Sequence, residues 1–108
     1  MREYNTLLWE NTNGIAKITL NRPDAANSVN LEMAQELMHV AMVCDEDNSI
    51  RAVILTATGN MFCAGGDVPS FQAAGDNVGL LLKDVTACLH SANARFARMT
   101  APLIIAIN

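Results

Sequence analysis

Apolar residues alternate with more polar ones along residues 15–20, and alternation with a period of two is typical of a strand that buries one face. Two strands are predicted, at residues 4–12 and 15–20. Asn13-Gly14 joins them, and this dipeptide tolerates the positive φ angles of a tight hairpin turn. Pro23 stops the second strand because proline cannot donate to the ladder. One face of that strand is wholly apolar, and it consists of Ala16, Ile18 and Leu20.

Two longer segments carry the spacing of amphipathic helices. The first is predicted to begin after Asn30, a favourable N-cap, with Glu32 in its first turn, and to end at the polar cluster of residues 45–49. The second is predicted from about Asp76 to Met99. Its apolar residues recur every three or four positions and line one face: Val78, Leu81, Leu82, Val85, Leu89, Ala92, Phe96 and Met99.

Two short β-branched runs, at residues 51–57 and 103–107, predict buried strands. Residues 61–67, between the first run and the second helix, contain two glycines and predict an irregular segment. The predicted order is β-β-α-β-α-β, which indicates an α/β protein with helices packed on a sheet.

Composition narrows the classes of function. The net charge is −4, and the seven basic residues are scattered, so no basic stripe exists for nucleic acid and no basic amphipathic face for a membrane surface. The three cysteines show no zinc spacing and indicate reduced thiols in a cytoplasmic protein. His39 and His90 have no carboxylate partner at ligand spacing, so no metal site is expected.

The segment Phe62–Val68 (FCAGGDV) is the main candidate for chemistry. Its glycines allow a sharp bend, and free N–H groups at a following helix start suit an anion or a developing oxyanion. A simple strand-to-helix turn with Asp67 as the cap explains the same residues. The pattern is neither a dinucleotide fingerprint nor a P-loop. A nucleophilic role for Cys63 would need a neighbouring base, and the sequence offers none.

Three stretches in fixed order decide how the chain is placed among known families. They are ITLNRP at 18–23 with AANS at 25–28, RAVILT at 51–56 with FCAGGD at 62–67, and APLIIAIN at 101–108. Together they resemble the motifs of the crotonase superfamily, the enoyl-CoA hydratase/isomerase family, and cover nearly the whole chain. The resemblance implies a crotonase-like α/β spiral of ββα units, with residues 1–108 as its N-terminal portion, truncated before the second oxyanion-hole motif.

The resemblance also assigns roles to residues. Gly66 matches the position whose backbone N–H is one of two donors to a thioester oxygen that becomes an enolate. Ala64 and the loop at Asp24-Ala25 match positions around the adenine of coenzyme A, and Asp67 and Val68 match the segment beside the pantetheine arm. Coenzyme A is then part of the substrate, and no covalently bound cofactor is implied.

Departures from the family pattern limit what the chain is expected to bind and to catalyse. Asp24 and Pro69 stand where basic residues are common, and Arg22 is read either as a contact to coenzyme A phosphates or as a solvated side chain. The hydratase acid/base glutamates match no position here, so the chain alone is expected to be inactive. A non-catalytic interaction or acyl-CoA-binding module, or a relative with dehalogenase, decarboxylase or synthase chemistry, remains an alternative. The full-length protein is expected to form a trimer or a dimer of trimers.

Overall fold

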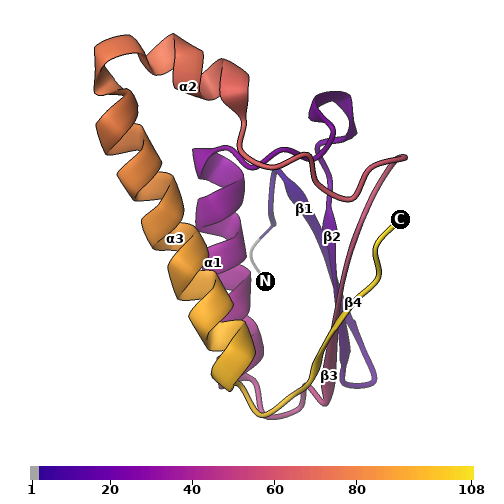
Figure 1. Ribbon diagram of the computed structural model, residues 1–108. Coiled ribbons are helices and arrows are strands. Elements are labelled where there is room, and N and C mark those ends of the chain that lie inside the picture. Colours follow the sequence, from indigo (N-terminus) through magenta and orange to yellow (C-terminus); the bar gives the residue numbers. More distant parts are fainter. Residues whose placement is uncertain (1–2) are drawn as a thin grey trace.

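Helices and sheet form two layers in the computed structural model, which describes residues 3–108 (Figure 1). The strands are β1 (Leu7–Thr12), β2 (Ile15–Leu20), β3 (Ala52–Ala57) and β4 (Leu103–Ile105). The helices are α1 (Leu31–Glu46), α2 (Val68–Ala74) and α3 (Val78–Arg98), with short 3₁₀ turns at Pro23–Ala25 and Gly75–Asn77. The sheet order is β1-β2-β3-β4, with β1 antiparallel to β2 and the later pairs parallel. The predicted α/β architecture is confirmed.

The β1–β2 hairpin forms at the predicted dipeptide. Asn13 and Gly14 both have positive φ, at 53° and 83°, and Thr12 pairs with Ile15 across the turn. The carbonyl of Gly14 accepts a hydrogen bond of 2.7 Å from the amide of Arg51, at the entry to β3. The hairpin is therefore tied to the next strand of the sheet as well as to itself.

The first strand begins later than predicted, at Leu7 rather than at Tyr4. The reason is the carboxylate of Glu36 on α1, which accepts hydrogen bonds from the backbone amides of Asn5 at 2.8 Å and Thr6 at 2.7 Å. The Thr6 hydroxyl donates to the same carboxylate at 2.6 Å. Amides bound to a helix side chain are not available to a sheet partner, so the strand starts after them.

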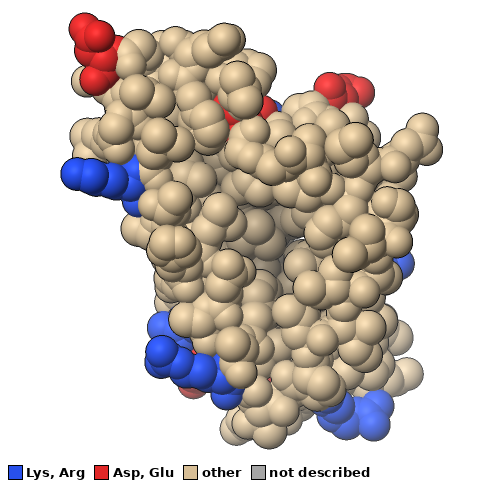
Figure 2. Space-filling view, in the orientation of Figure 1, with Lys and Arg blue, Asp and Glu red and all other residues tan. Residues whose placement is uncertain are grey.

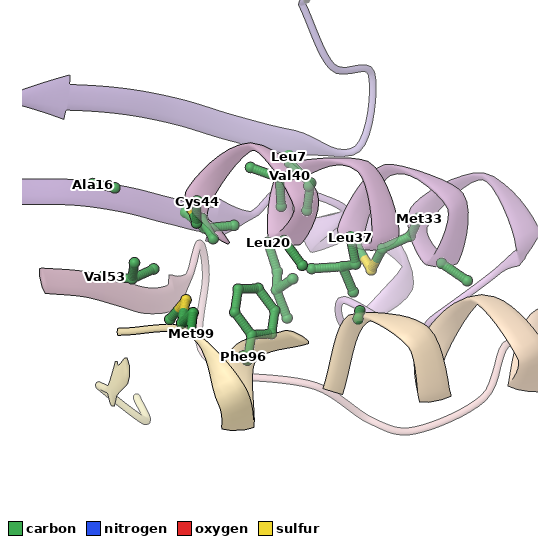
Figure 3. Close-up of a cluster of buried hydrophobic side chains, with 14 of the residues drawn as sticks. Leu7, Ala16, Leu20, Met33, Leu37, Val40, Cys44, Val53, Phe96 and Met99 are labelled. Carbon is green, nitrogen blue, oxygen red and sulfur yellow. The ribbon is translucent and has the colours of Figure 1, made fainter. Parts of the chain in front are cut away.

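The core lies between the sheet and the two long helices (Figure 3). Ile18 from β2, Val53 from β3 and Met33 and Val40 from α1 are fully buried. Phe96 adds an aromatic ring from α3. Asn30 caps α1 as predicted, since its side chain accepts a hydrogen bond of 2.9 Å from the amide of Met33.

Two helices follow the glycine turn, as predicted, with Gly75 at a positive φ of 55° between them. One feature of the C-terminal half differs from expectation. The strand β4 is not buried: Ile104 and Ile105 are 52% and 50% exposed. It lies at the edge of the sheet and pairs only with β3, so its burial is that of an edge strand. Among residues 3–108, no helix combines the length and apolarity needed to cross a bilayer.

Candidate functional site

The glycine turn runs across one end of the sheet, from β3 towards the first residue of α2 (Figure 1). Gly65 has a φ of +109°, a conformation that residues with a side chain rarely adopt. At Gly66 the constraint is one of space rather than backbone angle. A Cβ there would lie 2.8 Å and 2.9 Å from Cε2 and Cζ at the end of the Phe71 ring, so that ring would have to move.

A parallel bridge holds this turn against the segment that precedes α1. The amide of Val29 donates to the carbonyl of Gly65 at 2.8 Å, and the amide of Asp67 donates to the carbonyl of Val29 at 3.1 Å. Groups on alternate residues of an extended segment point to opposite sides, so the Gly66 N–H faces away from Val29. Within residues 3–108 it donates to no acceptor. The Gly66 amide is thus an unpaired donor just before α2.

The carboxylate of Asp67 is buried and collects donors from three segments. Its Oδ1 accepts from the hydroxyl of Ser28 at 2.6 Å and from Nη1 of Arg22 at 3.4 Å, and its Oδ2 accepts from the hydroxyl of Ser70. The Ser28 and Ser70 hydrogen bonds and the nearby Arg22 charge hold the pKa of Asp67 below its ordinary value, against the opposing effect of burial. Asp67 is therefore anionic and fully engaged within the chain.

Arg22 is not the fully solvated side chain that one expectation described, and its Nη1 is engaged within the chain. That nitrogen pairs with Asp67 and also donates to the backbone carbonyl of Ser28. The guanidinium side chain is only 21% exposed. Its position shows that the loop before α1 and the start of α2 share one polar junction.

The structure brings the two groups of expected coenzyme A contacts together. The amide of Ala64 donates to the carbonyl of Ala26 at 3.1 Å, directly after Asp24 and Ala25 in the 3₁₀ turn. Val68 follows at the start of α2 and is 58% exposed. The predicted positions Asp24, Ala25, Ala64, Gly66, Asp67 and Val68 thus lie on two adjacent segments.

Three polar side chains of this junction carried no predicted role. Asn27 is almost completely buried, and its amide group donates to the carbonyls of Thr58 and Met61 at 2.8 Å and 2.9 Å. Ser28 and Ser70 meet at the same carboxylate although 42 positions separate them in sequence. No spacing rule links such residues, so only the fold reveals them.

Other candidates do not form a second centre among the described residues. The Nδ1 of His39 is 2.6 Å from the hydroxyl of Tyr4, and no group of three metal-ligating side chains occurs in residues 3–108. Cys63 is half-buried, with Sγ 3.9 Å from the carbonyl of Gly65. Neither residue has the arrangement of a nucleophile with its base.

A hollow of about 520 Å³ opens between α3 and the β3–β4 edge, and the face that carries it is drawn in Figure 2. Charged side chains lie towards the margin of that face. The lining is mostly apolar and includes Leu37, Leu55, Leu89, Phe96, Met99 and Leu103. Gly66 is not among the lining residues, so this hollow and the glycine turn are separate features.

The family model described as enoyl-CoA hydratase/isomerase matches residues 10–108. The chain belongs to this family. The match includes every predicted site residue, and it agrees with the crotonase-like fold of the structural relatives.

Three relatives illustrate the range of the family. A probable enoyl-CoA hydratase of Rhizobium meliloti is 33% identical over 97% of this chain and 39% of its own length. Human enoyl-CoA delta isomerase 2 is 29% identical over 97% of this chain and 27% of its own. The crystal structure of an enoyl-CoA hydratase of Mycobacterium smegmatis superposes with a TM-score of 0.84 at 31% identity, covering 94% of this chain and 39% of that one. The chain thus spans less than two-fifths of the length of these relatives.

Proposed function

We propose that this chain is the N-terminal part of an acyl-CoA enzyme of the hydratase/isomerase type, and that the Gly66 N–H is one donor of its oxyanion hole. The observation that carries the proposal is the unpaired Gly66 amide, held between the carbonyl of Gly65 and the amide of Asp67, which both bind Val29. A thioester carbonyl bound there gains negative charge as its enolate forms, and the amide stabilises that charge.

The fixed turn supports this role energetically. An oxyanion donor is effective when it is already aimed before the reaction, because no reorganisation is then needed as charge develops. Losing one such donor typically costs about 3–4 kcal/mol of transition-state stabilisation. The hydrogen bonds on both sides of Gly66 hold the turn in place, so the amide is oriented before a substrate binds.

Coenzyme A is proposed to lie along the two adjacent segments at Asp24-Ala25 and Ala64–Val68. The Asp67 side chain is turned inward, so its backbone rather than its carboxylate would meet the pantetheine arm. The exposed side chain of Val68 offers an apolar surface to the same arm. Asp24 is exposed and acidic, so its side chain supplies no positive charge for the phosphates at this end.

The proton-transfer groups are proposed to come from outside residues 1–108. Hydration of a conjugated thioester needs one group to position water and another to deliver a proton. Glu36, the one buried glutamate of the described chain, already accepts three hydrogen bonds from Asn5 and Thr6. The chain alone is therefore proposed to be inactive. The complete protein is proposed, separately, to be a cytoplasmic homo-oligomer. Turnover of crotonyl-CoA by the isolated chain would contradict the first of these statements.

The oxyanion role is tested by proton–nitrogen NMR on the isotope-labelled chain. Acetoacetyl-CoA, whose thioester enolises readily, is expected to shift the Gly66 amide resonance, and free coenzyme A, which lacks the carbonyl, is expected to leave it in place. Gly79 on α3, with open space around its Cα, is the internal control. An equal Gly66 response to both compounds, or none to either, would refute the proposal.

A further inference from the structure

The carboxylate of Asp67 joins the same two segments that the backbone bridge joins. Ser28 precedes Val29, whose amide and carbonyl bind the residues on either side of Gly66. Ser70 lies in the first turn of α2, and its amide also donates to the carbonyl of Asp67 at 3.0 Å. The side chain and the backbone of Asp67 therefore hold the glycine turn to two elements. One is the segment at Ser28-Val29 that precedes α1, and the other is helix α2, which follows the turn in sequence.

The burial of this carboxylate makes the arrangement energetically demanding. Asp67 is 6% exposed, and a buried charge is tolerated only where hydrogen bonds or opposite charges replace water. Two hydroxyls and Arg22 supply that replacement. In residues 3–108, no fully buried side-chain nitrogen or oxygen is left without a partner. The hydrogen-bonded surroundings of the Asp67 charge therefore lie next to the unpaired Gly66 amide.

We propose that Asp67 is a positioning residue for the Gly66 amide, acting through Ser28 and Ser70 to keep that N–H aimed away from the chain. The inference rests on the proposed oxyanion role of Gly66 and deepens it. Asp67 itself does not touch the substrate through its side chain, because both carboxylate oxygens are occupied. Its effect is on the fraction of molecules whose turn is correctly oriented.

The capping alternative gives a different expectation. Asp67 occupies the N-cap position of α2, but its side chain accepts no hydrogen bond from a helix amide. A residue that served only the helix would affect the stability of α2 and leave the bridge to Val29 unchanged. The bridge amide of Val29 is therefore the local reporter of positioning.

The experiment compares the unmodified chain with D67A, D67N and V40A in two measurements. One is the dissociation constant for acetoacetyl-CoA, read from the Gly66 resonance, and the other is hydrogen exchange at the Val29 amide. D67A removes the acceptor, while D67N keeps the shape and one carbonyl oxygen. V40A removes buried methyl groups from the centre of α1, remote from the turn, and controls for general loss of stability.

Loss of hydrogen bonds to a charged acceptor should weaken thioester binding in D67A by about tenfold and speed Val29 exchange by a similar factor. D67N is expected to stay within about threefold of the unmodified chain, since it can keep the Ser28 hydrogen bond. If D67A fails to fold, S70A, which removes one hydroxyl donor, is expected to show a smaller change of the same kind.

Unchanged binding and exchange in D67A would overturn the inference, and so would equal losses in V40A. Absence of any thioester response in the unmodified chain would instead refute the proposed function. Val29 exchange, which needs no ligand, would in that case still decide whether the carboxylate orders the turn.

Discussion

Glu36 offers the sharpest test of what holds the N-terminal segment in place. Its carboxylate is 4% exposed and binds two backbone amides and one hydroxyl, all from Asn5 and Thr6. Replacing it with alanine removes all three hydrogen bonds at once. Water can reach Asn5, which is exposed, but Thr6 is 3% exposed, so its amide and hydroxyl would stay without partners.

The expected magnitude follows from those two stranded groups. Each buried donor left unsatisfied costs about 1–3 kcal/mol. Part of this sum is offset because the variant no longer pays the desolvation cost of a buried carboxylate. We expect E36A to lower the free energy of unfolding by about 3 kcal/mol. E36Q keeps an acceptor oxygen but loses the charge, so we expect about 1–2 kcal/mol.

Urea unfolding followed by circular dichroism measures these differences. With a denaturant slope near 2 kcal/mol per molar, E36A should lower the midpoint by about 1.5 M. Glu32 is the matched control, because it lies one turn earlier on α1, is exposed and accepts a single hydrogen bond of 2.9 Å from the Asn5 side chain. E32A should cost about 0.5 kcal/mol or less. An E36A value within about 0.5 kcal/mol of E32A would refute the reasoning.

Three further predictions concern the glycine turn and two titrating groups. G65A should lower the free energy of unfolding by about 1–3 kcal/mol through backbone strain alone, whereas G79A, on a helix, should raise it by about 0.5–1 kcal/mol; urea unfolding checks both. Burial, and secondarily Asp47, raises the pKa of the Cys44 thiol from 9.0 to about 12. Stability should therefore fall as pH rises from about 9 to 12, where only the unfolded thiol ionises, and C44A should remove that loss in alkaline unfolding curves. The lowered pKa of Asp67 adds stability above pH 3.8 that is lost as pH falls through the folded value, so D67N should flatten the acid limb of the same curves.

Local patterns were sufficient wherever neighbouring residues decide the structure. The hairpin at Asn13-Gly14 and the cap at Asn30 formed as predicted because each depends on φ angles or hydrogen bonds within a few positions. The apolar face of Ile15–Leu20 is buried as expected, since it packs in the core that the sheet shares with α1. The family assignment from ordered motifs is likewise confirmed.

The failures share one cause, which is a partner distant in sequence. Strand β1 starts at Leu7 because Glu36, thirty positions away, binds the amides before it. The burial expected for residues 103–107 was wrong because an apolar run is equally compatible with the edge of a sheet, and nothing local indicates which strand takes the edge. The ion pair between Arg22 and Asp67 was not predicted because the two residues are 45 positions apart.

The order of elements, the family and the two glycines of the turn follow from the sequence alone. That the second glycine keeps a free amide follows from the fold, because the bridge to Val29 uses the carbonyl of Gly65 and the amide of Asp67 and leaves the Gly66 N–H facing the other way. The fold also decided the electrostatics, since Ser28, Ser70 and Arg22 reach one carboxylate only when the chain has folded. Spacing along a chain encodes local geometry, whereas contacts across it depend on how the layers pack.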